Sequence, residues 1–214
     1  MCADLVCHGA PSQKIFDDYI EEEEKRLRLN ITKVKFHHKI QNNKNWTTRN
    51  ILLSTEDGKE YSLTRFKTDY LRAYHPCLMN RESCYECRYS KPERYGDITI
   101  GDFWGIKRFY KDLSVEHGVS IVQANTNVGV DILDYMKDEM DYYPIDRNEY
   151  LKKFGNSLAK TGGIKMNPKR NRFLEIERTK GFHKAVVSIY PLHYDRIRLK
   201  YGELKKHIKR LLKK

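Results

Sequence analysis

Apolar and polar residues follow two different periods along the first 40 residues, which predicts short strands around one helix. Residues 4–7 form a brief apolar run, and Ser12 then offers a side-chain oxygen as a helix N-cap. The segment after Ser12 repeats apolar residues about once per turn, at Ile15, Phe16, Tyr19, Ile20 and Leu27. Residues 31–36 alternate singly between apolar and polar, so a second strand is expected there.

The middle of the chain continues with strands and one more helix. An Asp-Gly turn separates the strand-like runs 50–54 and 60–64, and this dipeptide is typical of a tight β-hairpin. Two further strands are predicted at 97–100 and 118–124, followed by a helix over 129–141. We therefore expect an α+β fold, with a mixed sheet, flanking helices and a β-hairpin near 50–64.

The C-terminal segment has the pattern of a basic amphipathic helix. Apolar residues recur at helical spacing over 196–214, at Ile197, Tyr201, Leu204, Ile208 and Leu211, and most of the other positions are Lys, Arg or His. Two interpretations fit this pattern. The helix packs on the body of the protein, or it binds an anionic membrane surface or an acidic partner.

Charge is distributed unevenly along the 214 residues, whose formal net charge is +12. Residues 1–150 contain 22 Lys and Arg against 25 Asp and Glu, whereas residues 151–214 contain 19 against 4. We expect a body over 1–150 and a basic helical C-terminal extension over 151–214. Because the body is not basic, nucleic acid is not the expected partner, and only the extension suits an anionic surface.

The N-terminus has no basic region before a long apolar stretch, and no apolar run approaches the roughly 18 residues of a membrane span. A cytoplasmic protein is expected, with any membrane association through the basic helix. Five cysteines in such a protein indicate a metal, a cluster or buried thiols rather than disulfides.

The strongest chemical motif is the pair Cys84 and Cys87, spaced as C-x-x-C, with Cys77 and Cys7 as further thiols. Two thiolates at this spacing reach one metal centre from a single turn. Structural zinc and an iron–sulfur cluster each need four ligands, whereas a redox dithiol needs the pair alone. The spacing favours zinc or a cluster and does not separate them.

The strand at 97–100 ends in two glycines that bracket an acid and two aromatic residues: Gly101, Asp102, Phe103, Trp104 and Gly105. Glycine lets a backbone approach a ligand closely, and aromatic faces suit a flat ring system. The simpler interpretation is a strand end whose aromatic side chains belong to the core.

Small polar residues also accompany the strand at 118–124, namely Ser120 within it and Asn125 and Thr126 after it. Backbone N–H groups at the start of the following helix suit a phosphate, although an ordinary N-cap explains the same residues. If this strand and 97–100 run in the same direction, the two turns lie at one sheet edge and form a cleft for a flavin nucleotide.

Taken together in order, these motifs resemble the C-terminal domain of the coenzyme F420 hydrogenase/dehydrogenase beta-subunit family. The resemblance extends from residue 4 to about 130. It is carried by Asp-Leu-Val-Cys-His-Gly-Ala-Pro-Ser at 4–12, Arg-Glu-Ser-Cys-Tyr-Glu-Cys at 81–87, Arg-Tyr-Gly-Asp-Ile-Thr-Ile-Gly-Asp-Phe-Trp-Gly at 94–105, Gly-Val-Ser at 118–120 and Asn-Thr at 125–126.

The resemblance implies an iron–sulfur flavoprotein that relays electrons between a 4Fe–4S cluster and FAD. It implies Cys7, Cys84 and Cys87 as cluster ligands, with Cys77 as a candidate fourth, and it makes Asp102, Phe103, Trp104, Ser120 and Thr126 candidate flavin contacts. Longer members carry an upstream ferredoxin-like segment, so the expected partner is that segment or a separate redox protein. The alternatives are an inactive truncated chain and a zinc-stabilised binding module whose basic tail meets nucleic acid or membrane.

Overall fold

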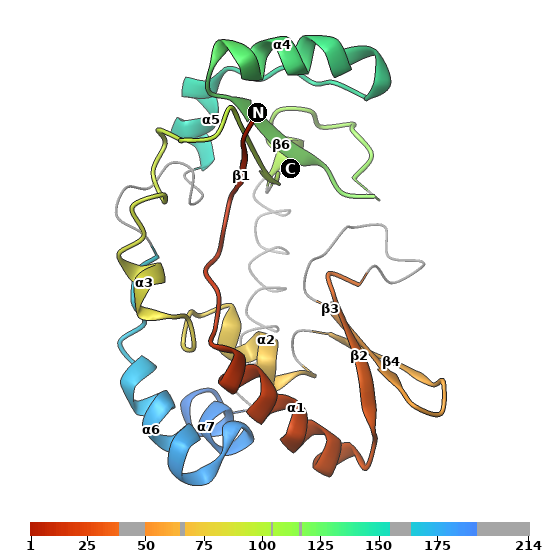
Figure 1. Cartoon of the computed structure of the whole chain (residues 1–214), viewed down its shortest axis with the longest axis vertical. Helices are drawn as coiled ribbons and strands as arrows, with labels where there is room; N and C mark the ends of the chain where they lie inside the picture. The colour runs from red at the N-terminus through yellow and green to blue at the C-terminus, as the bar shows by residue number, and fades with distance from the viewer. Residues whose placement is uncertain (39–49, 65–66, 104, 116, 155–163, 192–214) are drawn as a thin grey trace, which may run out of the picture. The chain divides into compact units, whose positions relative to one another are not determined.

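The computed structural model describes residues 1–38, 50–64, 67–103, 105–115, 117–154 and 164–191 (Figure 1). The chain forms two compact units, each assembled from separated segments. Unit one contains the described parts of Met1–Ala10 and Asn80–Lys165, and unit two contains those of Pro11–His38, Thr48–Met79 and Met166–Lys214. The predicted division near residue 150 remains a prediction.

Unit one is built on a mixed three-stranded sheet. Strands β1 (Ala3–Leu5), β5 (Ile98–Asp102) and β6 (Ser120–Ala124) lie in the order β1-β5-β6. β1 is parallel to β5, whereas β6 is antiparallel to it. The strands predicted from the apolar runs are therefore present, with ends that differ by one or two residues.

Short helices and an aromatic core complete unit one: α3 (Glu82–Tyr85), η1 (Ile106–Arg108), α4 (Asn127–Met136), η2 (Lys137–Glu139) and α5 (Arg147–Phe154). The helix predicted over 129–141 begins two residues earlier, because Thr126 is its N-cap and Thr126 Oγ1 accepts a hydrogen bond from Gly129 N–H at 3.2 Å. Phe103, Ile106 and Tyr150 form the buried core.

The β-hairpin predicted near 50–64 is part of unit two. Strands β2 (Ile31–Phe36), β3 (Asn50–Thr55) and β4 (Glu60–Thr64) form an antiparallel sheet in that order. In the turn, Asp57 accepts hydrogen bonds from Lys59 Nζ at 2.6 Å and from Thr55 Oγ1 at 2.5 Å. These two bonds lower the pKa of Asp57 to about 2.

In the described part of unit two, four helices flank this sheet: α1 (Gln13–Leu27), α2 (Asp69–Tyr74), α6 (Arg170–Lys180) and α7 (Phe182–Ile189). As predicted, Ser12 caps α1, accepting a hydrogen bond from Ile15 N–H at 3.3 Å. The apolar sides of helices and sheet share one core, whose fully buried members include Tyr19, Ile51, Leu53, Phe173, Phe182 and Val186. The prediction of an α+β fold is confirmed.

The predicted amphipathic helix over 196–214 lies outside the described residues. Within the described part of the chain, no helix has both the length and the apolar character that a bilayer crossing requires.

Candidate functional site

Two of the predicted cysteine ligands, Cys7 and Cys84 of α3, are bonded to one loop of unit one. Cys7 Sγ accepts a hydrogen bond from Gly9 N–H at 3.2 Å, and Cys84 Sγ accepts one from Ala10 N–H at 3.4 Å. Arg81 N–H donates to the Ala10 carbonyl at 2.9 Å, which ties the loop to the start of α3. Neighbouring amides of one turn therefore hold the sulfurs of two residues that are 77 positions apart in sequence.

Cys87 follows α3 by two residues and is half-buried, like Cys84, whereas Cys7 is exposed. Cys77 belongs to unit two, where it is buried and its Sγ lies 3.9 Å from the His75 carbonyl oxygen. Across the described ranges, no three His, Cys, Asp or Glu residues are arranged so that they could hold a metal ion. That Cys7, Cys84 and Cys87 bind one metal centre remains a prediction.

At the end of β5 the predicted flavin contacts have different surroundings. A Cβ at Gly101 would lie 2.6 Å from Val6 Cβ, so this glycine permits a close approach of β5 to the residue after β1. Phe103 is only 6% exposed and packs on Phe109 and Tyr150, with ring centroids 5.8 and 5.4 Å away. Its ring belongs to the core, which is the simpler of the two interpretations.

Three other predicted residues flank Phe103. Trp104 lies outside the described residues. Gly105 has φ of 91° and precedes η1. Ser120 is paired with Asp102 in the sheet, so it lies at the same end of β5 as Gly101 and Asp102.

The expected cleft between the two turns is not formed, which corrects the sequence prediction. β5 and β6 run in opposite directions, with Ile98 opposite Ala124 and Asp102 opposite Ser120. The turn after β5 and the turn after β6 therefore lie at opposite ends of the strand pair, roughly 13 Å apart for strands that rise about 3.3 Å per residue.

The second turn is fastened to β5 by side-chain hydrogen bonds. Asn125 Nδ2 donates to the Gly96 carbonyl at 2.8 Å and to Thr99 Oγ1 at 3.0 Å. Thr126 Oγ1 donates to Asp97 Oδ1 at 2.7 Å while it caps α4. Backbone N–H of Cys2 donates to the other oxygen of Asp97, and these bonds lower the pKa of Asp97. Asn125 and Thr126 thus hold the sheet and α4 together.

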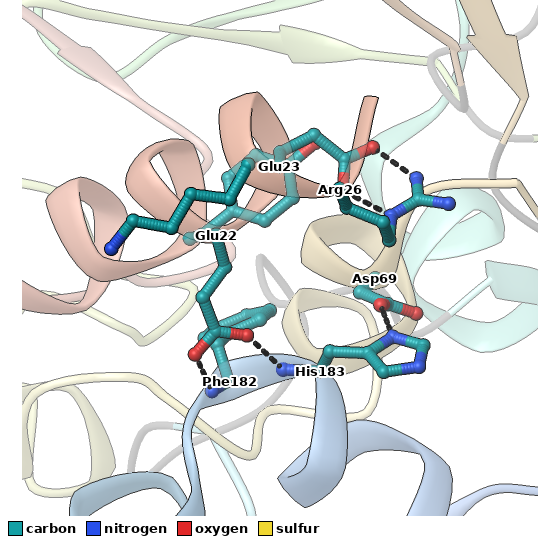
Figure 2. Close-up of a pocket in the computed structure, with 8 residues that line it drawn as sticks. Glu22, Glu23, Arg26, Asp69, Phe182 and His183 are labelled. Carbon is teal, nitrogen blue, oxygen red and sulfur yellow. Dashed lines mark hydrogen bonds and ion pairs between the residues drawn. The ribbon is translucent and has the colours of Figure 1, made fainter. Parts of the chain in front are cut away.

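Unit two contains a pocket of about 320 Å³ that the sequence analysis did not predict. Figure 2 shows that it lies where α1, α2 and α7 meet. Glu22 of α1 accepts hydrogen bonds from the first two amides of α7, Phe182 N–H at 2.5 Å and His183 N–H at 2.8 Å. Beside it, Glu23 pairs with Arg26 through contacts of 2.5 and 3.1 Å.

His183 is oriented in this pocket by a buried ion pair. Its Nδ1 lies 2.5 Å from Asp69 Oδ2, and the other oxygen of Asp69 accepts from Arg72 Nη1 at 2.8 Å (Figure 2 shows the contact with Asp69). The His183 side chain is 43% exposed, whereas that of Arg72 is 3% exposed. All three carboxylates that line the pocket are engaged in protein contacts. Glu22 joins α1 to α7 and Asp69 joins α2 to α7, whereas Glu23 pairs with Arg26 within α1.

The sequence contains no signal for this pocket. Glu22 belongs to a run of four glutamates that is typical of a solvated helix face, and its partners are about 160 residues away. Local periodicity does not show which member of such a run points inward.

Residues 1–147 match the family model for the C terminus of the coenzyme F420 hydrogenase/dehydrogenase beta subunit. No curated protein matches the chain. Among solved structures, a chain of the F420-reducing NiFe hydrogenase complex from Methanosarcina barkeri is 17% identical, with a TM-score of 0.36. The alignment covers 87% of this chain and 48% of that chain, so this protein spans about half the length of the hydrogenase chain.

Proposed function

Because the chain belongs to the coenzyme F420 hydrogenase/dehydrogenase beta-subunit family, we propose that it is an oxidoreductase subunit that relays electrons between a 4Fe–4S cluster and a flavin. When bound, the cluster exchanges single electrons and the flavin couples them to a two-electron step. The role of the polypeptide is to hold both groups and to set their potentials. The proposal includes a redox partner protein, because the family is named for the beta subunit of a complex with several subunits.

The observation that carries the cluster part is the loop that holds Cys7 and Cys84. Each sulfur accepts a hydrogen bond from an amide of Gly9 or Ala10. Such bonds stabilise negative charge on a thiolate and are one of the means by which a protein sets the potential of a cluster. Thiolate donors suit both iron–sulfur clusters and zinc, so the proposal rests on the type of donor and the metal itself must be measured.

In this proposal Cys7, Cys84 and Cys87 supply three thiolates. A 4Fe–4S cluster takes four ligands, so one more is required, from this chain or from a partner. The half-buried state of Cys84 and Cys87 would limit access of water to the cluster while leaving a route for an electron to a docked partner.

The flavin part of the proposal rests on the family and on the end of β5. We assign FAD contacts to Gly101, Asp102, Gly105 and Ser120, which share one end of the strand pair. Asn125 and Thr126 are left out of this assignment because their side chains are bonded to Gly96, Asp97 and Thr99 at the other end.

The test is the metal content of the full chain purified without oxygen. We expect iron and acid-labile sulfide in the unaltered chain and a loss of most of both in Cys7→Ser and Cys84→Ser. Cys2→Ser is the matched control, because Cys2 is also exposed near the N-terminus and should leave the iron content unchanged. One equivalent of zinc with no iron would instead support the zinc-stabilised binding module.

The flavin assignment is tested by titrating FAD into the same preparations. Asp102→Ala should weaken binding, whereas Thr126→Ser, which keeps the hydroxyl at the opposite end of the sheet, should bind as the unaltered chain does. Equal affinities of these two variants would show that the flavin contacts lie elsewhere.

A further inference from the structure

Helix α4 carries a stripe of apolar side chains on the outside of unit one. Val128, Ile132, Tyr135 and Met136 recur at spacings of four, three and one residues, which places them along one side of the helix. Val128 is 50% exposed, Tyr135 87% and Met136 43%. Large apolar side chains gathered in this way on a surface mark an interaction site.

Gly129 marks the side of α4 that contacts the sheet. Gly129 is buried, and a Cβ at this position would lie 2.1 Å from the Asp97 carbonyl oxygen, so the backbone of α4 is pressed against the start of β5 there. Tyr135 lies well around the helix from Gly129 and therefore projects away from this contact. Val128 and Tyr135 therefore form the outward part of the stripe, whereas Met136, seven residues from Gly129, lies at its edge nearest the sheet.

An acidic row runs beside the stripe. Asp131, Asp134 and Asp138 are spaced three and four residues apart, and all three are exposed. Over residues 127–141 there are five acidic residues and one Lys. We call this surface the acidic apolar stripe; it consists of the three aspartates together with Val128, Ile132, Tyr135 and Met136. Such a surface favours a partner that is both apolar and basic.

The sequence of this chain contains a segment with those two properties. Residues 196–214 contain nine Lys and Arg and one Glu, and their apolar residues recur at helical spacing. We propose that residues 196–214 of a second copy of the chain dock on the acidic apolar stripe, and that two copies exchange these segments reciprocally. This inference is independent of the proposed redox function.

Reciprocal exchange follows from the size of the contact. A single contact on one side of the ten-residue helix α4 buries less than the roughly 1,200 Å² that specific protein interfaces need. A two-fold symmetric dimer forms the same contact twice and doubles the buried area. Part of the attraction is between exposed charges, so the dimer should weaken as salt rises and the Debye length falls below about 10 Å.

The test uses two full-length variants measured by sedimentation. The stripe variant is D131K with D134K and D138K, and the tail variant is K205E with K206E and K209E. The unaltered chain is expected at twice 25.5 kDa, and each variant alone at 25.5 kDa. The substituted positions then carry the same sign of charge as the surface that they would face, which should weaken each dimer at least about tenfold.

Sedimentation of a mixture of the two variants is the decisive measurement. In an equimolar mixture each stripe meets a tail of opposite charge, so a heterodimer should form, and its formation also shows that both variants are folded. The control is E60K with D112K and E175K, three exposed acids outside α4 that change the net charge equally and should leave the dimer intact. Y135S, which alters one exposed ring, should weaken the dimer without lowering thermal stability.

Three results would overturn the inference. One is an unaltered chain that stays at 25.5 kDa at about 100 μM, and another is a mixture in which the variants remain monomers. The third is binding of the unaltered chain and the stripe variant to phosphatidylserine vesicles with equal affinity and without dimers, which would assign the tail to a membrane surface.

Discussion

Glu177 of α6 and Asp18 of α1 form a hydrogen-bonded carboxyl pair inside unit two. Burial, and next the hydrogen bond with Asp18, raise the pKa of Glu177. Burial raises the pKa of Asp18 as well, but the hydrogen bonds with Lys14 and Glu177 outweigh this effect, so the pKa of Asp18 is lowered. As pH rises, Asp18 therefore loses its proton before Glu177 does, and Asp18 pairs with Lys14 at 2.5 Å.

This pair predicts a pH dependence of stability. The pKa of Glu177 is higher in the folded state than in the unfolded state. Its contribution to the free energy of unfolding is therefore fully present below about pH 4.5 and is lost as pH rises through the folded-state pKa. Glu177→Gln keeps a donor to Asp18 without a titrating proton. We expect the variant to gain in free energy of unfolding, relative to the unaltered chain, as pH rises from 4.5 to 7.

Urea unfolding at both pH values measures this difference. Glu175→Gln is the control for removing one negative charge from α6, since Glu175 is exposed on the same helix. A Glu177→Gln difference that is flat across this range would contradict the shared proton.

The residues of the candidate site were predictable to unequal degrees. The C-x-x-C pair pointed to Cys84 and Cys87, and the structure places Cys84 beside the loop of Cys7. The two interpretations of Phe103 could not be separated in sequence, because a buried aromatic and a flavin contact have the same local pattern. The contact of His183 with Asp69 joins residues 114 positions apart, and no spacing rule encodes such a pair.

At the scale of elements, the features that depend on neighbouring residues, such as helix caps and tight turns, were predicted from the sequence. Ser12 begins α1, and the Asp-Gly turn at Asp57 joins β3 to β4 with Asn50 opposite Thr64. The direction of β6 against β5 could not be predicted, because an apolar run has the same composition whichever way its neighbour runs. Strand order and direction are fixed by connections and packing across the whole unit.

The cap of α4 allows a prediction about an element. Thr126 Oγ1 both accepts from Gly129 N–H and donates to Asp97. Thr126→Ala removes both bonds and should lower the free energy of unfolding by about 1 kcal/mol, within a range of about 0.5–2 kcal/mol for lost N-caps. Thermal unfolding measures the loss, and Thr126→Ser should restore most of it. Equal losses in the two variants would mean that the methyl group, and not the hydroxyl, carries the effect.

On the scale of the whole molecule, the two units have separate cores. Phe103 belongs to the core of unit one, and Phe173 is fully buried in that of unit two. Deleting a buried phenyl ring costs about 3–5 kcal/mol. We expect Phe103→Ala to raise amide exchange mainly in β5 and β6, and Phe173→Ala to raise it mainly in α1 and α7.

Hydrogen exchange with mass spectrometry resolves these regions within the full chain. Local opening energies differ between cooperative parts of a protein, so separate responses are expected from separate cores. Loss of protection in both units after either substitution would show that the chain unfolds as one cooperative body.

The interleaved course of the chain has a consequence for synthesis on the ribosome. After Met1–Ala10, which belongs to unit one, the chain enters unit two with α1 and the hairpin sheet, yet the core of unit two is completed only by Phe173 and Phe182 of α6 and α7. Most of unit one, including its core residues Phe103 and Tyr150, lies between these halves in the sequence. During translation the apolar side of α1 therefore stays exposed while unit one is completed, because α6 and α7 have not yet been synthesised. A nascent chain halted near residue 154 would be a natural client of chaperones that bind exposed apolar segments.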